Sequence, residues 1–348
     1  MSSSLTIRTS TPGTSLRRSG RQRFIWLVVV LLLLAGLSAV SVTTGARNVS
    51  GQDILAAISG STVTIGQAAV AKRIPRTLMA LLAGAALGVA GAVMQGVTRN
   101  PLADPGILGV NAGAALAVVV GIAWFNMSLS YTYIWTAILG AALAAVFVYA
   151  IGSLGSGGAT PLKLAQAGTA TSIALASFIN AVVLGRNDIA GGVRSWLVGG
   201  VGGITFDRIW LVLPMLLIGL AISLLAARSL NSLALGEEVA TGLGENVMMA
   251  RALSSLGAVM LCGATTAVCG PIGFVGLAVP HICRLLVGVD HRWLIPFSAL
   301  TGACLLIAAD VMGRLVARPS ELDAGIITAL LGAPVFIWLA RQRKVREL

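Results

Sequence analysis

Charged residues are scarce in this sequence. Of its 348 residues only 10% are Asp, Glu, Lys or Arg, whereas 57% are hydrophobic and the mean hydropathy is +0.92. A soluble globular domain carries about 25% charged residues, so a chain this poor in charge cannot cover a water-facing surface. The composition therefore excludes a soluble domain and predicts a protein whose surroundings are lipid.

Cysteine and histidine are also few. The four cysteines lie in or beside apolar runs and form no CxxC pair, and neither of the two histidines stands at ligand spacing. No disulfide framework and no metal site are therefore expected, and we interpret the cysteines as small, buried, reduced side chains. A structural role is favoured for His281 and His291, since neither has a nucleophile or carboxylate partner at motif spacing.

Motifs for catalysis are missing as well. The sequence has no GxxxxGK[ST], no GxSxG and no HExxH, so the chain does not itself bind ATP phosphates. No catalytic residue and no cofactor are expected, and an intramembrane enzyme is disfavoured for want of a Ser/His or paired-Asp constellation. The net charge of +12 would suggest nucleic acid in a soluble protein. Here the basic residues mostly flank apolar runs, which favours lipid as the partner and no nucleic acid.

Long apolar runs recur throughout the chain. A helix needs about 20 residues to span a hydrocarbon core of roughly 30 Å, and backbone polar groups in lipid must be satisfied within helices or closed barrels. The runs predict an all-α fold, a polytopic membrane helical bundle of about ten transmembrane helices. The expected helices are 24–44, 77–97, 106–125, 131–151, 164–185, 208–227, 248–269, 273–288, 293–316 and 325–340.

The distribution of Lys and Arg predicts the orientation of the bundle. With a cytoplasmic N-terminus, 15 of the 24 basic residues fall in cytoplasmic segments and 9 on the outer side, which agrees with the excess of positive charge inside. Both termini are therefore expected in the cytoplasm. Residues 1–23 are expected to be a disordered basic tail, and residues 24–348 a single transmembrane domain.

Two features of the spanning segments bear on their packing. Small residues recur four apart at Gly84/Gly88 and Gly109/Gly113, which predicts faces where helices pack closely. Asp310 is the one acidic residue deep inside an apolar run, where it costs about 2.5–3.5 kcal/mol. Capping or hydrogen bonding to neighbouring backbone inside the bundle is its favoured role, and a proton or cation site of an ion-coupled secondary transporter is the alternative.

One connection on the expected cytoplasmic side is amphipathic. Residues 228–247 place apolar residues at roughly helical spacing, which predicts one or two short helices lying on the inner face. Two glutamates, Glu237 and Glu238, stand near the start of its second half, where they suit a helix N-terminus.

Several motifs follow one another in a fixed order between residues 70 and 340: they span 72–76 (KRIPR), 84–95, 99–105, 230–236, 270–277 and 328–336. Together they resemble the FecCD family, the permeases of iron-siderophore and cobalamin ABC importers. The resemblance implies an ABC importer permease that carries an iron-siderophore complex across the cell membrane, with cobalamin or haem as the alternatives.

The resemblance also implies the partners of such a permease. Cytoplasmic ATP-binding subunits would hydrolyse ATP, and an extracytoplasmic substrate-binding protein would deliver the substrate. A second permease subunit, identical or related, would complete the pathway.

Three sites are further implied by the resemblance. Arg73 and Arg314 match outward-facing arginines that bind carboxylates of the binding protein, a task that suits a guanidinium because it binds a carboxylate bidentately. Arg76 is interpreted as an anchor at the membrane interface.

The other two sites lie on the expected cytoplasmic side. Residues 228–247 would be the coupling segment, of which residues 231–244 would press into a groove of the ATPase, where small residues permit close approach. The inner gate is expected at Thr160, Pro161 and Leu162. The residues expected to contact the ATPase are Asn231, Leu233, Leu235, Gly236, Glu237, Ala240 and Gly244.

Overall fold

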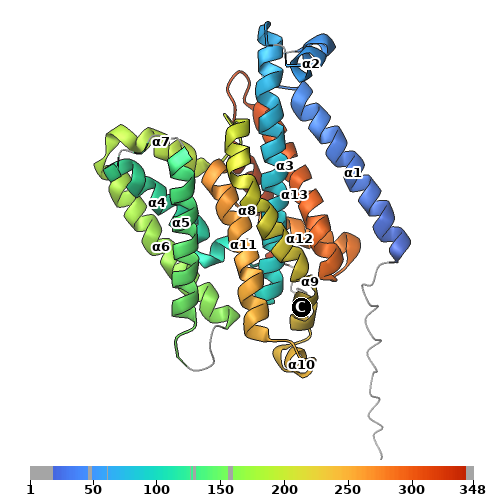
Figure 1. The fold of residues 1–348 in the computed structure, drawn as a ribbon, viewed down its shortest axis with the longest axis vertical. Helices are drawn as coiled ribbons and strands as arrows, with labels where there is room; N and C mark the ends of the chain where they lie inside the picture. The colour runs from blue at the N-terminus through green and yellow to red at the C-terminus, as the bar shows by residue number, and fades with distance from the viewer. Residues whose placement is uncertain are drawn as a thin grey trace, which may run out of the picture.

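The structure, a computed structural model, describes residues 19–45, 49–60, 62–125, 127, 131–155 and 160–341, and these residues form helices without strands (Figure 1). The ten longest helices correspond one by one to the ten predicted segments, which confirms the all-α bundle. They are α1 (Gly20–Thr43), α3 (Ile65–Thr98), α4 (Val110–Phe125), α5 (Tyr131–Gly152), α6 (Pro161–Gly185), α8 (Phe206–Leu225), α11 (Val247–Cys269), α12 (Val275–Val287), α13 (His291–Val316) and α14 (Ala324–Arg341).

Seven of the ten are long and apolar enough to cross a membrane, and α4, α12 and the first part of α14 are shorter apolar helices. Between them lie short elements: η1 (Pro105–Leu108), α2 (Gly51–Ile58), α7 (Asn187–Val198), α9 (Ala227–Ala234) and α10 (Glu237–Gly242). The amphipathic connection 228–247 thus forms two short helices, as predicted, and Glu237 and Glu238 occupy the first turn of α10.

Two helices begin earlier than their apolar runs. α3 begins at Ile65 and not near residue 77, because Thr64 and Gln67 form a capping box: the Thr64 hydroxyl accepts from the Gln67 amide at 3.1 Å, and Gln67 Oε1 accepts from the Thr64 amide at 3.2 Å. α1 begins at Gly20 behind the N-cap Ser19. The first 18 residues of the expected disordered tail lie outside the described residues.

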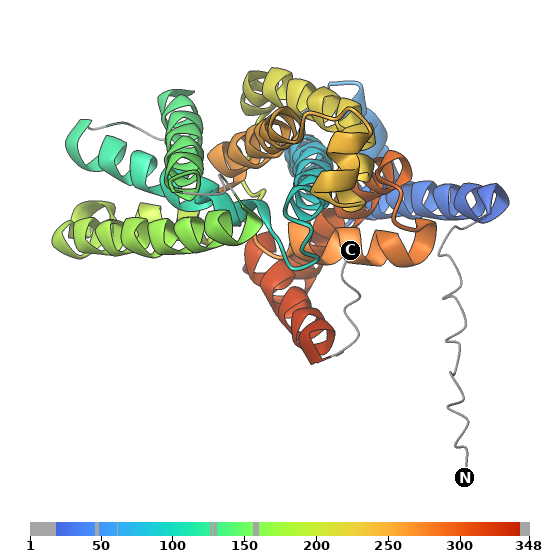
Figure 2. The ribbon, with the colours of Figure 1, turned by 90° about the horizontal axis from the view of Figure 1, so that it is seen from below.

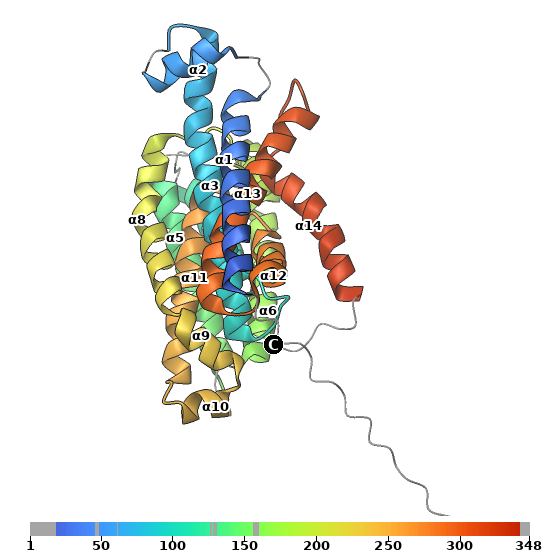
Figure 3. The same cartoon turned by 90° about the vertical axis from the view of Figure 1, so that its right-hand side faces the viewer.

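α3 forms the centre of the bundle (Figure 2). In an apolar stretch of 18 residues in α3, 78% of the residues are buried. In the corresponding stretch of α1, the share is 11%. α8, α11, α12 and α13 pack around α3, while α4, α5 and α6 form a group to one side (Figure 1). α1 and α14 lie at the periphery, and α14 diverges from the bundle (Figure 3).

Glycines allow the backbones of α3 and its neighbours to touch. A Cβ added at Gly84 or Gly88 would clash with a carbonyl oxygen of α13, and one at Gly91 with the carbonyl of Gly276 in α12. The prediction of close packing at Gly84/Gly88 is therefore confirmed. Of the second pair, Gly113 packs against the backbone of α5, but Gly109 has φ +71° and ends η1, so its role is conformational.

The bundle has two distinct ends. We call the end that carries α2 and the α13–α14 connection (residues 317–323) the α2 end, and the end that carries α9 and α10 the α10 end (Figure 1). α3 and α13 run between them, so each contributes residues to both ends. The polar residues with candidate functions lie at these two ends.

Candidate functional site

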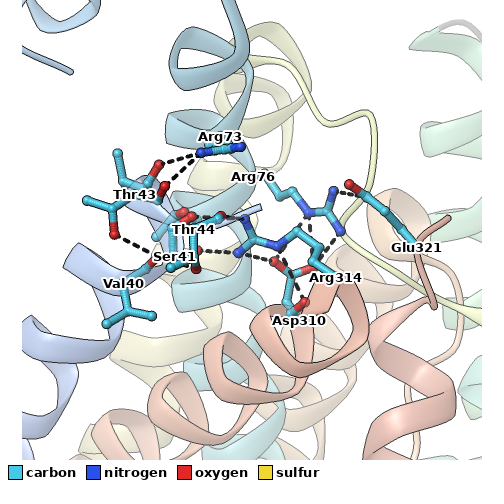
Figure 4. A network of polar contacts seen from close by, with 11 residues as sticks. Val40, Ser41, Thr43, Thr44, Arg73, Arg76, Asp310, Arg314 and Glu321 are labelled. Carbon is cyan, nitrogen blue, oxygen red and sulfur yellow. Dashed lines mark hydrogen bonds and ion pairs between the residues drawn. The ribbon is translucent and has the colours of Figure 1, made fainter. Parts of the chain in front are cut away.

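An arginine cluster lies at the α2 end of α3 and α13 (Figure 4). The Asp310 carboxylate accepts from Arg76 Nε at 3.0 Å and Nη2 at 2.8 Å, and it pairs with Arg314 Nη2 at 2.9 Å. Arg76 Nη1 also pairs with Glu321 at 2.5 Å. The Asp310 side chain is 1% exposed, and two arginines flank it. The expectation that Asp310 binds neighbouring backbone is therefore wrong, because its carboxylate is bound by two arginine side chains.

The same cluster holds the last turn of α1. Arg314 Nη1 donates to the carbonyl oxygens of Ser41 at 2.9 Å and Thr44 at 3.0 Å, and Arg73 Nη1 donates to that of Thr43 at 3.0 Å. The last carbonyls of a helix have no partners within it, and cations near a helix C-terminus are favoured by its dipole. The arginines of α3 and α13 therefore cap α1, a helix that buries little of its own surface.

These contacts differ from the roles that the sequence implies for the three arginines. The docking assignment expects exposed guanidiniums, but Arg73 is 8% exposed and Arg314 is 2% exposed, so this expectation is wrong. Arg76, interpreted as an interface anchor, instead bridges Asp310 and Glu321. No sequence pattern could reveal this, because Asp310 lies 234 residues from Arg76. Whether Arg73 and Arg314 contact a partner protein stays a prediction.

A cavity of about 480 Å³ opens beside the cluster. It is lined by Lys72, Arg73, Arg76 and Arg314 with a single acidic residue, Glu321, so the cavity is basic. Lys72 is exposed and was assigned no role from sequence. The α2 end thus offers a cationic recess to an anionic group from outside.

The residues implied in ATPase coupling divide into two sets at the α10 end. Leu233 and Ala240 are buried, and Asn231 points inward to accept and donate hydrogen bonds with the start of α13. Leu235, Glu237 and Gly244 are exposed. Leu233 of α9 and Ala240 of α10 are thus turned toward the core. Contact of Asn231, Leu233 and Ala240 with a partner stays a prediction.

Two glycines of this segment have positive φ angles, and the close approach of a partner that is expected there stays a prediction. Gly236 has φ +111° and Gly244 has φ +85°, and a Cβ added at either position would meet no other group within 4 Å. They allow the chain to turn after α9 and after α10, and they do not mark a close approach within the chain.

An exposed apolar surface remains at the α10 end, which we call the α10 face. Its side chains surround α10 and begin α11, and they have no covering element among the described residues. Contiguous exposed apolar surface of this kind marks an interaction site. The α10 face comprises Leu235 (61% exposed), Val239 (50%), Leu243 (66%), Met248 (75%) and Met249 (56%).

The expected inner gate begins α6. The Thr160 hydroxyl accepts from the Lys163 amide at 3.4 Å as the N-cap, Pro161 occupies the first turn, and Leu162 is 68% exposed. These residues have a clear local role in starting the helix. The gating role stays a prediction, and residues 156–159 before it lie outside the described residues.

The four cysteines are buried and free, which confirms their predicted burial. Within the described ranges there is no group of three or more His, Cys, Asp or Glu residues placed to hold a metal ion.

Outside the spanning helices, the carboxyl of Asp290 has a shifted pKa. Burial alone would raise the pKa of its carboxyl, but hydrogen bonds from Asn231 and the Arg292 amide outweigh it and hold the pKa below its ordinary value.

A sequence profile of the FecCD transport family matches residues 29–342. The chain belongs to the FecCD transport family. It is 42% identical over 315 residues to the ferric enterobactin transport system permease protein FepD of Escherichia coli (strain K12), covering 90% of this chain and 94% of the relative. It is 41% identical to the Fe(3+)-citrate import system permease protein YfmD of Bacillus subtilis (strain 168), covering 94% and 97%.

A solved structure agrees with this membership. A metal-chelate type ABC transporter in an inward-facing conformation superposes with a TM-score of 0.79 at 28% identity, covering 91% of this chain and 98% of that one. The FecCD chain is therefore a multi-pass membrane permease subunit of an ABC importer and not itself an enzyme, as its sequence indicates.

Proposed function

We propose that this FecCD permease carries an iron-siderophore complex across the cell membrane, driven by ATP hydrolysis in separate subunits. The observation that supports the substrate is the agreement among relatives: three at 41–42% identity are named for ferric enterobactin, Fe(3+)-citrate and iron(3+)-hydroxamate transport. The basic recess at the α2 end suits an anionic ferric chelate approaching from outside. Haem is the principal alternative, because the hemin transport system permease protein HmuU of Yersinia pestis is 39% identical over 79% of this chain; cobalamin is the other.

An ion-coupled carrier is the competing class of transporter. The one feature that favours it is Asp310, since an unpaired acid inside a membrane protein is a candidate proton or cation site. Here Asp310 is bound by Arg76 and Arg314. A carboxylate held by two arginines is poorly suited to exchange cations, so the geometry disfavours this class.

The proposed orientation places the α10 end in the cytoplasm with both chain termini. α1 begins and α14 ends toward the α10 end (Figure 3), and the sequence assigns 15 of the 24 basic residues to the cytoplasmic segments. The α10 face would then meet the ATP-binding subunits, and the α2 end would meet the substrate-binding protein. A second permease subunit, the same chain or a relative, would complete the pathway.

Uptake by iron-starved cells tests the substrate. Cells lacking the gene should lose accumulation of labelled ferric siderophores and keep that of labelled cobalamin and haem, and the gene on a plasmid should restore it. Loss of haem or cobalamin uptake alone would retain the importer and reject the proposed substrate. Uptake that survives removal of the ATP-binding subunits but collapses with a protonophore would support the ion-coupled class instead.

Docking at the α2 end is tested best at Lys72, which lines the basic recess and is exposed. Reversing its charge (Lys72→Glu) should weaken binding of the substrate-loaded binding protein about fivefold to tenfold, since close charge pairs across an interface contribute about 1 kcal/mol or more. Lys72→Arg, which keeps the charge, is the matched control. Equal affinity of both variants in a liposome binding assay would place docking elsewhere.

A further inference from the structure

The side chain of Asn231 ties α9 to the beginning of α13. Its Nδ2 donates to Asp290 Oδ1 at 2.7 Å, and its Oδ1 accepts from the His291 amide at 2.9 Å. Asp290 Oδ1 also accepts from the Arg292 amide at 3.0 Å. The first amides of a helix have no partners within it, so Asn231 and Asp290 together cap α13. Only one orientation of the Asn231 amide satisfies both its donor and its acceptor contacts.

The imidazole of His291 extends this junction to α3. Its Nδ1 lies 2.9 Å from Asn231 Oδ1, and because that oxygen only accepts, Nδ1 carries the proton. On the other side of the ring, a Cβ added at Gly96 of α3 would lie 2.7 Å from His291 Nε2. The absence of a side chain at Gly96 lets the ring fill the space between α9 and α3.

The inner face of α9 and its C-terminal end therefore have different surroundings. Its inner face buries Leu230 and Leu233 completely or nearly so, at 0% and 1% exposure, against the core. Its end leads directly into the α10 face, where Leu235 and Val239 are exposed. A force applied to the α10 face would reach α13 through Asn231, a short side chain held at both polar atoms.

α3 and α13 continue from this junction to the α2 end. α13 has 26 residues, a length of roughly 39 Å at 1.5 Å per residue, and it carries Asp310 and Arg314 near its other end. Close backbone contacts at Gly84 and Gly88 leave no flexible side chain between the two helices there. The pair forms a stiff connection between the α10 face and the arginine cluster.

We infer that Asn231 is a positioning residue that couples the ATPase contact on the α10 face to the α3–α13 pair, and not a residue that touches the ATPase. The inference rests on the proposed function, because it takes the α10 face as the ATPase contact. Motion of the ATP-binding subunits then shifts the start of α13 directly, and the shift is carried along α13 to the end that meets the binding protein.

The test uses the full importer in liposomes, with ATP hydrolysis and ferric siderophore uptake measured with and without substrate-loaded binding protein. Asn231→Ala should leave assembly and basal hydrolysis within about twofold, while stimulation of hydrolysis and uptake fall about tenfold, within the range of coupling between sites. Ser232→Ala, one residue along on α9, is the matched control and should behave as wild type.

Exchanging the residue types at positions 231 and 290 distinguishes a coupling role of Asn231 from a purely structural one. Asn231→Asp alone places two carboxylates together and should uncouple more strongly than Asn231→Ala. Combined with Asp290→Asn, it restores a donor and an acceptor between positions 231 and 290 with their roles exchanged. Asp290 Oδ1 accepts both from Asn231 and from the Arg292 amide, so the exchange restores the contact between 231 and 290 but not the whole cap. Stimulation and uptake should therefore recover in part, clearly above the level of Asn231→Asp alone, as expected for residues that act as one network.

Three results would overturn the inference: normal stimulation in Asn231→Ala, failure of that variant to assemble, or an assembled double variant that stays uncoupled. Failure of the proposed ATPase contact is seen separately, in binding of the ATP-binding subunits to permeases altered on the α10 face. If those permeases bind the subunits normally, the contact lies elsewhere and the proposed function is revised, whatever the Asn231 variants show.

Discussion

Replacing Arg314 with alanine should strongly destabilise the folded permease. Arg314 is 2% exposed, pairs with Asp310 at 2.9 Å, and donates to Ser41 Oγ at 2.7 Å as well as to two carbonyls of α1. Its loss leaves Asp310 with Arg76 alone and removes the bonds of Arg314 to the end of α1, where those of Arg73 remain. Removing one partner of a buried ion pair costs about 3–5 kcal/mol, which should lower the midpoint of thermal unfolding in detergent by several degrees or prevent accumulation in the membrane.

The matched control is Arg318→Ala. Arg318 is exposed and donates to the carbonyl of Gly45 at 2.7 Å, so this substitution removes a cation from the same region without opening a buried pair. Arg314→Lys should be intermediate, because an ammonium cannot reproduce the fork of hydrogen bonds made by a guanidinium. A stable Arg314→Ala permease that loses only its affinity for the binding protein would instead support a docking role for Arg314.

Two charges on the α10 face should abolish transport by separating the permease from its ATPase. In the variant Leu235→Asp with Val239→Asp, two side chains that are 61% and 50% exposed become anionic, so the isolated permease should fold normally. Burying a Leu or Val side chain contributes about 1.5–3 kcal/mol, so losing both contacts should weaken ATPase binding by about a hundredfold or more, since 1.4 kcal/mol is about tenfold.

Binding of the purified ATP-binding subunits to the permease in detergent measures this effect, and uptake in cells should fall to the level of the gene deletion. The matched control, Leu235→Val with Val239→Leu, keeps the surface apolar and its total side-chain volume unchanged, and should retain binding within about threefold, because swaps that conserve volume are well tolerated. Wild-type affinity of a folded double-aspartate variant would place the ATPase contact on another surface.

Hydropathy located the ten long helices well but not all of their ends. A run of apolar residues shows where a helix lies in lipid, and it does not show where the helix begins in water. The capping box of Thr64 starts α3 about three turns before its apolar run, so that Lys72, Arg73 and Arg76 all lie on a helix. The spacing of apolar residues in 228–247 was enough for α9 and α10, because each must bury one face.

The candidate sites were harder to obtain from sequence than the helices. Motifs pointed to Arg73, Arg314 and the coupling segment, yet they could not show which side chains face outward. Arg314 pairs with Asp310 one turn away on its own helix, whereas Arg76 pairs with the same carboxylate from α3. Asn231 lies near the start of an expected contact segment and is turned inward by its bonds to Asp290 and His291.

The sequence by itself determined that this protein is a helical membrane bundle and an importer permease of the FecCD family, because charge content, apolar run length and ordered motifs are local properties of the chain. Only the tertiary structure decided that Arg73 and Arg314 hold the end of α1, that Asn231 caps α13, and that the α10 face stays open. Those contacts join residues far apart in the chain, and their partners are chosen by how α3, α9 and α13 pack together.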